Sequence, residues 1–341
     1  MLNFTIEKIT PALVVPAGHP DAGEIQVRYD PLTSRSCRLT FARAGERESG
    51  TDELPEPPPA AMDTRSCPFC QPQVNRLTPT IDPRLSGEPR LRRGESILFP
   101  NLFPYGRYSA VSVIDNRHFV PIGTADADAY LNCLLNCRDY LEKVLTADID
   151  ARHVAITQNH LPAAGGSLVH PHLQIQADAK PTNFLRFLSA RADSFYRETG
   201  RLLLSTYLEH ELAGGERLIG RTGDWHWLAA FAPEGFYEIW GILPEAFSLL
   251  NLKEKQWREL AAGIINTQRF YRSLNRNGYN LGLLAVESGD SRLELRARIV
   301  VRANYSQWAR NDHTGFEVML GDMATFTAPE QTAATARKFW G

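Results

Sequence analysis

The segment Gly165–Gln176 constrains the fold of this chain more than any other feature, because it holds two histidines on either side of a proline. Its sequence is Gly-Gly-Ser-Leu-Val-His-Pro-His-Leu-Gln-Ile-Gln. The residue before a proline favours extended backbone, and alternate side chains of a strand lie on one face. The pattern predicts a strand that presents His170, His172 and Gln174 on one surface. The glycine pair before it allows backbone to approach a phosphate closely.

A second constraint is the Cys67-Pro68-Phe69-Cys70 knuckle, whose two thiols have the spacing that holds one tetrahedral zinc ion. A redox-active pair is the alternative, but that alternative expects a helix directly after the motif. The segment 71–83 holds three prolines, which predicts that it is not a helix. Zinc is therefore favoured, and the remaining ligands should be histidines.

The other cysteines are expected to be core thiols. Cys133 and Cys137 lie four apart in a segment with helical spacing of apolar residues, and Cys37 lies in a strand-like run. Five cysteines in 341 residues fit a reducing compartment better than a disulfide framework. No apolar run is long enough to span a bilayer, and the N-terminus does not resemble a signal peptide. These features predict a cytoplasmic protein with no membrane partner.

The charge pattern indicates a small-molecule substrate. The formal net charge is −2, and acidic and basic residues are interspersed along the chain. No stretch of lysine or arginine alternates with aromatic residues, so nucleic acid is not expected as a partner.

Hydrophobic periodicity predicts an α+β chain whose strands and helices recur in two diverged repeats. Each repeat should contain a strand pair, a helix and a second strand pair. The expected elements are Asn101–Ile122, Ala125–Val144 and Val154–Gln176 in the first repeat, and Trp227–Leu243, Leu252–Phe270 and Tyr279–Val301 in the second. This divides the chain into an N-terminal half, 1–180, and a C-terminal half, 181–341, with a helical segment over Phe184–Leu218.

In their order along the chain, these motifs resemble the galactose-1-phosphate uridylyltransferases of the histidine-triad superfamily. The resemblance is carried by Asp30-Pro31-Leu32-Thr33, Arg43, Cys67-Pro68-Phe69-Cys70, Pro100–Pro104, His118, Asn159, Ser167 and His170-Pro171-His172-Leu173-Gln174. It implies an α+β fold of two histidine-triad-like repeats, with antiparallel sheets and helices packed on one face. It also implies zinc on Cys67, Cys70, His118 and His170, and catalytic roles for His172, Gln174 and Ser167. It further implies nucleotide contacts from Arg43, Asn101, Leu102, Phe103 and Asn159.

The resemblance implies a nucleotidyltransferase of nucleotide-sugar and galactose metabolism that acts as a homodimer. It would move a nucleotidyl group from a UDP-hexose-like nucleotide sugar to a sugar 1-phosphate through a covalent intermediate on His172. A neutral imidazole is a competent nucleophile near neutral pH and a good leaving group afterwards, which predicts ping-pong kinetics. One alternative is a nucleotide-sugar or dinucleoside-polyphosphate phosphorylase that uses inorganic phosphate. Another is a non-catalytic, zinc-stabilised nucleotide-binding module.

The second repeat departs from the family pattern. Arg296 and Arg298 stand where histidines for a second metal are expected, so that metal is predicted to be absent. Two arginines on one strand face either bind an anion or form solvated ion pairs. Phe316 and Glu317 resemble the family's pair for sugar hydroxyls, but the residues before them lack the expected lysine and aromatic residue. Met323 also stands in place of an expected glutamine.

Overall fold

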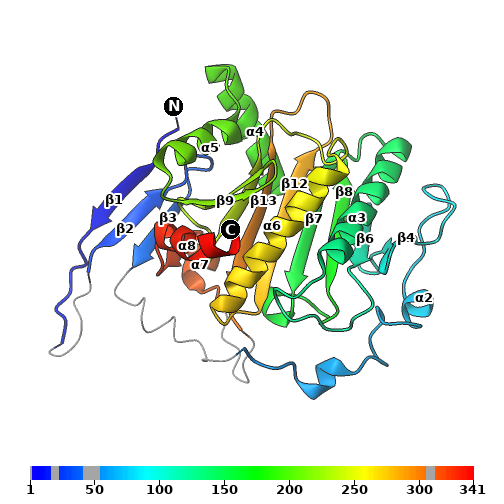
Figure 1. Ribbon diagram of the computed structural model, residues 1–341. Coiled ribbons are helices and arrows are strands. Elements are labelled where there is room, and N and C mark those ends of the chain that lie inside the picture. The colour runs from blue at the N-terminus through cyan, green and yellow to red at the C-terminus, as the bar shows by residue number, and fades with distance from the viewer. Residues whose placement is uncertain (1, 17–22, 41–53, 305–311) are drawn as a thin grey trace.

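The computed structural model of the protein describes residues 2–16, 23–40, 54–304 and 312–341. These residues form the α+β fold that the sequence predicts, with a ten-stranded sheet and a separate four-stranded sheet (Figure 1). Helices cover both faces of the ten-stranded sheet, but a different pair of helices lies on each face.

The ten-stranded sheet is antiparallel throughout, in the order β4-β5-β6-β8-β7-β12-β13-β11-β10-β9. The first five strands are β4 (Leu91–Arg93), β5 (Ser96–Pro100), β6 (Tyr108–Val113), β8 (His172–Asp178) and β7 (His153–His160). The other five are β12 (Gly278–Val286), β13 (Leu295–Arg302), β11 (Ile239–Leu243), β10 (Trp225–Ala229) and β9 (Leu218–Thr222). Both sets follow one order outward from the centre, because β12 corresponds to β7, β13 to β8 and β11 to β6. The predicted repeat is therefore visible in the topology.

The two halves of the sheet meet at β7 and β12, which pair from His160 opposite Tyr279 to His153 opposite Val286. The ladder is continuous along the full length of β7, so the two repeats share one backbone hydrogen-bond network. No gap separates two sheets at this seam.

Helices α3 (Ala127–Ala147) and α6 (Glu254–Ser273) lie side by side on one face of the sheet, as predicted (Figure 1). The Asp126 side chain begins α3 by accepting a hydrogen bond from the Ala129 amide at 2.8 Å. Apolar residues at helical spacing bury one face of each helix, with Leu141 in α3 and Trp257 in α6 among the fully buried side chains. Cys133 and Cys137 lie in this core, which confirms them as core thiols.

The opposite face of the sheet is covered over its C-terminal half. Helices α4 (Asn183–Thr199) and α5 (Leu203–Gly214) pack there against β10 and β11, which confirms the helical segment predicted after residue 184. The four-stranded sheet lies beside them, with strands β1 (Thr5–Ile9), β2 (Ile25–Tyr29), β3 (Ser36–Thr40) and β14 (Met323–Thr325). Its Cys37 is buried in the same core.

The remaining helices are short. They are α2 (Val74–Leu77), α7 (Gly315–Leu320), α8 (Pro329–Ala336) and three 3₁₀ turns, η2 (Pro59–Met62), η3 (Pro162–Ala164) and η4 (Arg337–Phe339). None of the described helices combines the length and the apolar character needed to cross a bilayer.

Two local predictions were wrong. The strand pair expected within Asn101–Ile122 lies earlier, because β5 ends at Pro100 and only β6 falls inside that range. The prolines of 71–83 do not exclude a helix, since the single turn of α2 fits between Pro72 and Pro79. Both errors arise where polar turn residues lie next to a short element, so periodicity cannot fix the boundary.

Candidate active site and metal centre

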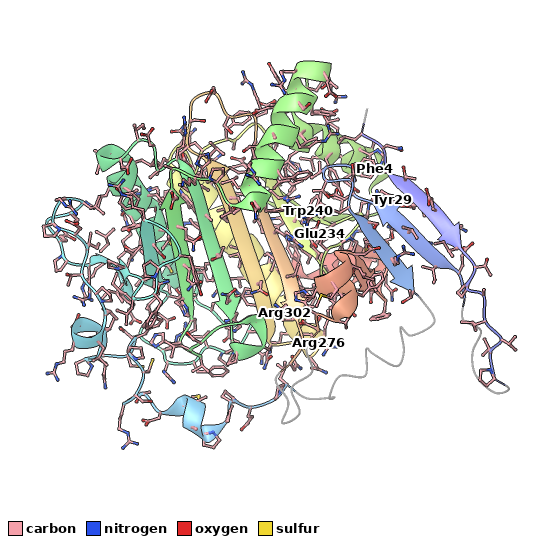
Figure 2. All side chains as sticks on the ribbon, turned by 180° about the vertical axis from the view of Figure 1, so that it is seen from behind. Phe4, Tyr29, Glu234, Trp240, Arg276 and Arg302 are labelled. Atoms are coloured by element: carbon pink, nitrogen blue, oxygen red, sulfur yellow. The ribbon has the colours of Figure 1, made fainter. Side chains whose placement is uncertain are left out.

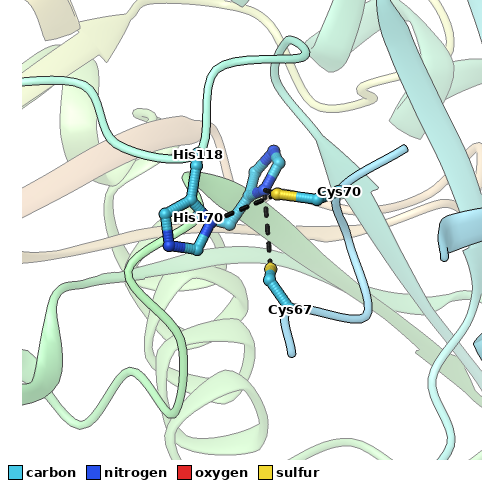
Figure 3. Close-up of side chains that lie close together, drawn as sticks. All are labelled: Cys67, Cys70, His118 and His170. Atoms are coloured by element: carbon cyan, nitrogen blue, oxygen red, sulfur yellow. Dashed lines mark hydrogen bonds between the residues drawn. The ribbon is translucent and has the colours of Figure 1, made fainter. Parts of the chain in front are cut away.

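The four predicted metal ligands lie close together, although they come from three separate loops. Cys67 and Cys70 come from the loop before α2, His118 from the loop after β6, and His170 from the loop before β8. One potential ligand atom from each residue lies within 4.8 Å of the other three (Figure 3). The Cys70 sulfur lies 3.2 Å from Nδ1 of His118 and 3.5 Å from Nδ1 of His170. These separations suit four donors around one cation.

Backbone carbonyls orient both imidazoles of this cluster. Nε2 of His118 lies 2.8 Å from the carbonyl oxygen of Ala61, and Nε2 of His170 lies 3.0 Å from that of Asp115. Each Nε2–H therefore donates away from the cluster, which leaves the Nδ1 lone pair directed at the thiols. Three of the four residues are buried. Two thiolates and two neutral imidazoles in this arrangement fit a tetrahedral transition metal.

His172 is the first residue of β8 and lies two residues from the ligand His170. Its Nδ1 is 2.8 Å from the His170 carbonyl oxygen, so Nδ1–H donates and Nε2 carries the lone pair. Nε2 has no hydrogen-bond partner among the described residues. Burial lowers the pKa of His172, which favours the neutral ring. The residue thus presents an oriented, neutral nitrogen, the form that a nucleophile requires.

The glycine turn before His172 is held by close backbone contacts. A Cβ atom at Gly166 would lie 2.7 Å from the carbonyl oxygen of Asn159 and 3.0 Å from that of Leu161. Gly165 has φ +85°, a conformation that favours glycine. Ser167, at the end of the turn, is exposed to solvent. The turn therefore folds back over the end of β7 and leaves the serine accessible beside the HPH motif.

The strand register determines which of the other predicted site residues share a surface with His172. Gln174 lies on the same face of β8, opposite Thr157 of β7. Asn159 lies two residues further along β7, and its side-chain oxygen accepts a hydrogen bond from Asn280 at 2.7 Å. Figure 2 shows this face of the sheet. Strands β7 and β8 therefore bring His172, Gln174 and Asn159 onto one surface.

Asn101, Leu102 and Phe103 lie beyond the end of β5, two strands from β8. The Asn101 side chain accepts a hydrogen bond from the Phe103 amide at 3.1 Å. Leu102 and Phe103 are exposed, at 60% and 77%. The register does not bring them against His172. Arg43 lies outside the described residues.

Phe316 and Glu317 lie on α7, next to β14 of the small sheet, on an element other than β8. The Glu317 carboxylate accepts hydrogen bonds from the Thr314 amide and hydroxyl, each at 2.6 Å, and so caps its own helix. The ring of Phe316 lies 5.9 Å from the guanidinium of Arg38. Both side chains have local structural partners here.

The two arginines of β13 have different environments. Arg298 donates to Glu238 through Nε at 2.6 Å and also pairs with Glu234 at 3.4 Å. Arg296 makes no hydrogen bond to any described residue, and its guanidinium stacks on Trp240 at 4.1 Å. Arg298 therefore forms ion pairs, as one of the two alternatives predicts, but its partners are buried or half-buried. Arg296 forms no ion pair with any described residue.

An aromatic pair on this face, of which Phe69 lies beside His172, was missed. The Phe69 ring lies 5.1 Å from the His172 ring in an edge-on arrangement and 5.3 Å from the Phe99 ring. Both join a small apolar cluster with Val111 and Val113 on this face. The signals were present, because Phe69 is inside the cysteine knuckle and Phe99 shares a strand face with Asn101.

Comparisons with known proteins agree with this fold. No family model matches the sequence. An uncharacterised protein of Archaeoglobus fulgidus is 28% identical, with 98% of each chain covered. An ADP-glucose phosphorylase from Arabidopsis thaliana, solved with bound ADP-glucose, matches with a TM-score of 0.70 at 20% identity, covering 92% of this chain and 99% of that one.

Two further solved structures share the fold. A GalT-like protein from Arabidopsis thaliana gives a TM-score of 0.69 at 18% identity, covering 92% of this chain and 98% of that one. A uridylyltransferase gives 0.66 at 18% identity with the same coverage. The resemblance found in the sequence is therefore confirmed for the fold.

Proposed function

We propose that the protein is a nucleotidyltransferase that carries its nucleotidyl group on Nε2 of His172. The observation that carries this proposal is the hydrogen bond from His172 Nδ1 to the His170 carbonyl, which fixes the tautomer with its lone pair on Nε2. The shared fold of an ADP-glucose phosphorylase and a uridylyltransferase supports the same chemistry. Both of those proteins are named for reactions at the phosphates of nucleotides.

In the first half-reaction, Nε2 of His172 attacks the α-phosphorus of a nucleotide sugar. A phosphorus–nitrogen bond forms, the bond from the α-phosphorus to the bridging oxygen breaks, and the sugar 1-phosphate leaves with the electron pair. Nδ1–H stays bonded to the His170 carbonyl, which stabilises the positive charge on the ring. In this proposal Gln174 and Ser167 donate hydrogen bonds to the α-phosphoryl oxygens, where negative charge develops.

In the second half-reaction, a phosphate oxygen of the acceptor attacks the same phosphorus, and the phosphorus–nitrogen bond breaks. The acceptor in the leading proposal is a sugar 1-phosphate. Inorganic phosphate is the second candidate, and one observation favours it. Glu317, which the resemblance assigns to sugar hydroxyls, is occupied in the cap of α7.

The nucleotide is proposed to lie over the N-terminal half of the site face. Asn159 is next to the nucleophile, and the Phe69–Phe99 pair offers an aromatic surface for a base. Asn101, Leu102, Phe103 and Arg43 complete the set that the resemblance implies.

We further propose zinc at the Cys67, Cys70, His118 and His170 cluster. Four protein ligands leave no open position, which is typical of a structural site. Zinc there would join the knuckle to the strand that carries His172, and it takes no part in either half-reaction. The homodimer implied by the resemblance stays a prediction.

The test is the intact mass of the protein after incubation with UDP-, ADP- and GDP-sugars without acceptor. We expect wild type to gain one nucleoside monophosphate and His172→Gly to gain none. Adding hexose 1-phosphate or inorganic phosphate to the adduct then identifies the acceptor that discharges it. Absence of any adduct with every donor, at full zinc occupancy, would favour the non-catalytic binding module.

A further inference from the structure

A cavity of about 310 Å³ lies over β7, β12 and β13, on the same face of the sheet as His172. Thr157, Gly282 and Arg298 are among the residues of its floor, and α4 and α5 form its upper wall. The Asp30–Thr33 turn closes one side through Leu32. Its volume falls within the range of pockets that hold small organic molecules.

The floor of the cavity is hollow at Gly282. This residue pairs with Thr157 on one side and with Arg298 on the other, in the middle of three adjacent strands. A Cβ atom built on it would meet nothing within 4 Å. Glycine weakens a strand interior, and it commonly marks a place where a ligand approaches the backbone.

Arg296 brings to this cavity a buried, charged side chain with an unused hydrogen-bond donor. Only 9% of the residue is exposed, and its Nη1 is buried without a partner among the described residues. Its guanidinium carbon lies over the Trp240 ring, 4.1 Å from the ring centroid. A buried guanidinium with open hydrogen-bonding capacity is costly unless something accepts from it. Figure 2 labels Trp240 and Glu234 in this part of the molecule.

Two carboxylates near the cavity already have hydrogen-bond partners. Glu294 accepts hydrogen bonds from the amides of Ser205 and Glu245, each at 2.9 Å. Asp30 accepts from the Leu32 amide at 3.1 Å and from the Thr33 hydroxyl at 2.7 Å. The carboxylates of Asp30, Glu238 and Glu234 attract the Arg296 charge, but none of them forms an ion pair or a hydrogen bond with it. Nη1 therefore stays open to an acceptor on a ligand.

The rest of the lining defines the ligand. The walls carry a large apolar surface, from Leu32, Phe184, Leu188, Leu203, Leu204 and Leu293. A bare inorganic anion would leave this surface unused. We infer that the cavity is a second binding site, for a small organic anion whose carboxylate or phosphate monoester meets Arg296 and whose apolar body lies against the leucines and Phe184.

Arg296, the charged group of this site, lies away from the nucleophile. It lies on β13, three strands from β8 in the sheet, and the cavity lining does not include His172, although it does include Asn159 of the proposed nucleotide site. The inference therefore does not depend on nucleotidyl transfer. In the second repeat, β13 has the place that β8 has in the first, so an anion site stands where the first repeat carries its histidines.

The test is isothermal titration calorimetry with phenyl phosphate, benzoate and inorganic phosphate. Wild type is compared with Arg296→Met, which keeps an apolar side chain on Trp240, and with Gly282→Val, which fills the floor. Valine suits a strand, so Gly282→Val should keep its thermal midpoint. Gly282→Ser is a smaller filler if the valine variant does not fold. His172→Gly is the matched control for binding at the nucleophile.

We expect one of the two aromatic anions to bind with unit stoichiometry and more tightly than inorganic phosphate. Arg296→Met should weaken binding roughly tenfold to a hundredfold, because a charged hydrogen bond is lost. Gly282→Val should abolish binding, and His172→Gly should leave it unchanged. Failure of both aromatic anions to bind at millimolar concentration would overturn the inference. So would binding that survives filling of the floor, or that disappears in His172→Gly.

Discussion

Nδ1 of His172 lies 2.8 Å from the carbonyl oxygen of His170, and Nδ1 of His170 belongs to the four-ligand cluster. The residue that orients the proposed nucleophile is thus itself a proposed metal ligand. A change at the cluster would reach His172 through one peptide carbonyl. The chemistry and the stability of this protein are therefore coupled at two residues, and variants can separate them.

Replacing His172 with glycine should lower nucleotidyl transfer by roughly three orders of magnitude or more, because no other described side chain supplies the oriented nitrogen. Metal content and thermal midpoint should stay near those of wild type, since His172 is not a ligand. Steady-state kinetics and elemental analysis measure both. His153→Gly, at the far end of the neighbouring strand, is the matched control and should keep its activity. Full activity in His172→Gly would disprove the mechanism.

Replacing Cys67 or Cys70 with serine should release the metal and cost more than about 3 kcal/mol of unfolding free energy. The reason is that the cluster ties the knuckle loop to β8. Chelation of wild type should reproduce the loss. Cys133→Ala serves as control, because its thiol is buried in the α3 core away from the cluster. Unchanged metal content in the serine variants would exclude this cluster as the site.

Replacing Gly166 with alanine should reduce transfer by as much as about a hundredfold, because the added Cβ has no room against the Asn159 carbonyl and shifts the turn beside His172. The metal should remain bound. The matched control is Gly289→Ala, where a Cβ meets nothing within 4 Å. Equal activity of the two variants would show that the turn does not position the site.

Arg298→Met should destabilise the fold by about 3–5 kcal/mol, since it leaves the buried Glu238 carboxylate without its cation. Arg296→Met should stay within about 1 kcal/mol of wild type or gain stability, because that guanidinium has no ion pair to lose. Denaturant unfolding of the pair measures the contrast. Equal losses in both variants would contradict the environments described here.

His160 should make stability depend on acidity. Burial, and then the neighbouring His172, lower the pKa of His160 to about 4, below the ordinary value of 6.5. A lowered pKa means that protonation favours the unfolded chain. Stability is therefore complete above about pH 6.5 and declines as pH falls toward 4, by about 3 kcal/mol at most.

The measurement is the difference in unfolding free energy between wild type and His160→Phe at several pH values. Phenylalanine keeps the ring that stacks on Tyr279 but cannot titrate. The two proteins should differ most in their acid sensitivity between pH 6.5 and pH 4. Parallel pH profiles would show that His160 is not the group responsible.

The Cys/His cluster was predictable because most of its residues lie at short, characteristic spacings in the sequence. The Cys67–Cys70 spacing and the pair of histidines around Pro171 each restrict geometry locally, and the structure confirms that His118 joins them. The roles of His172, Gln174 and Ser167 remain proposals. The fold class followed from periodicity, whereas the start of β5 did not, because Asn101 marks the turn after the strand and not its beginning.

Residues that depend on strand register could not be predicted. Gly282 lies next to Thr157 only because β7 and β12 pair with one particular alignment. Likewise, Arg298 finds Glu238 across two strands whose pairing no local pattern encodes. Phe69 meets Phe99 only after the knuckle folds onto the sheet. Such contacts arise between segments far apart in sequence, where periodicity carries no information.

The shared ladder between β7 and β12 makes each repeat obligatory for the other. A chain divided near residue 180 would leave both strands as long unpaired edges, with backbone donors and acceptors open to any passing strand. Each fragment would therefore be prone to aggregate through its exposed edge strand. The second repeat is therefore required even without catalytic residues of its own. Its strand β12 pairs with the edge of β7, the strand next to the one that carries His172.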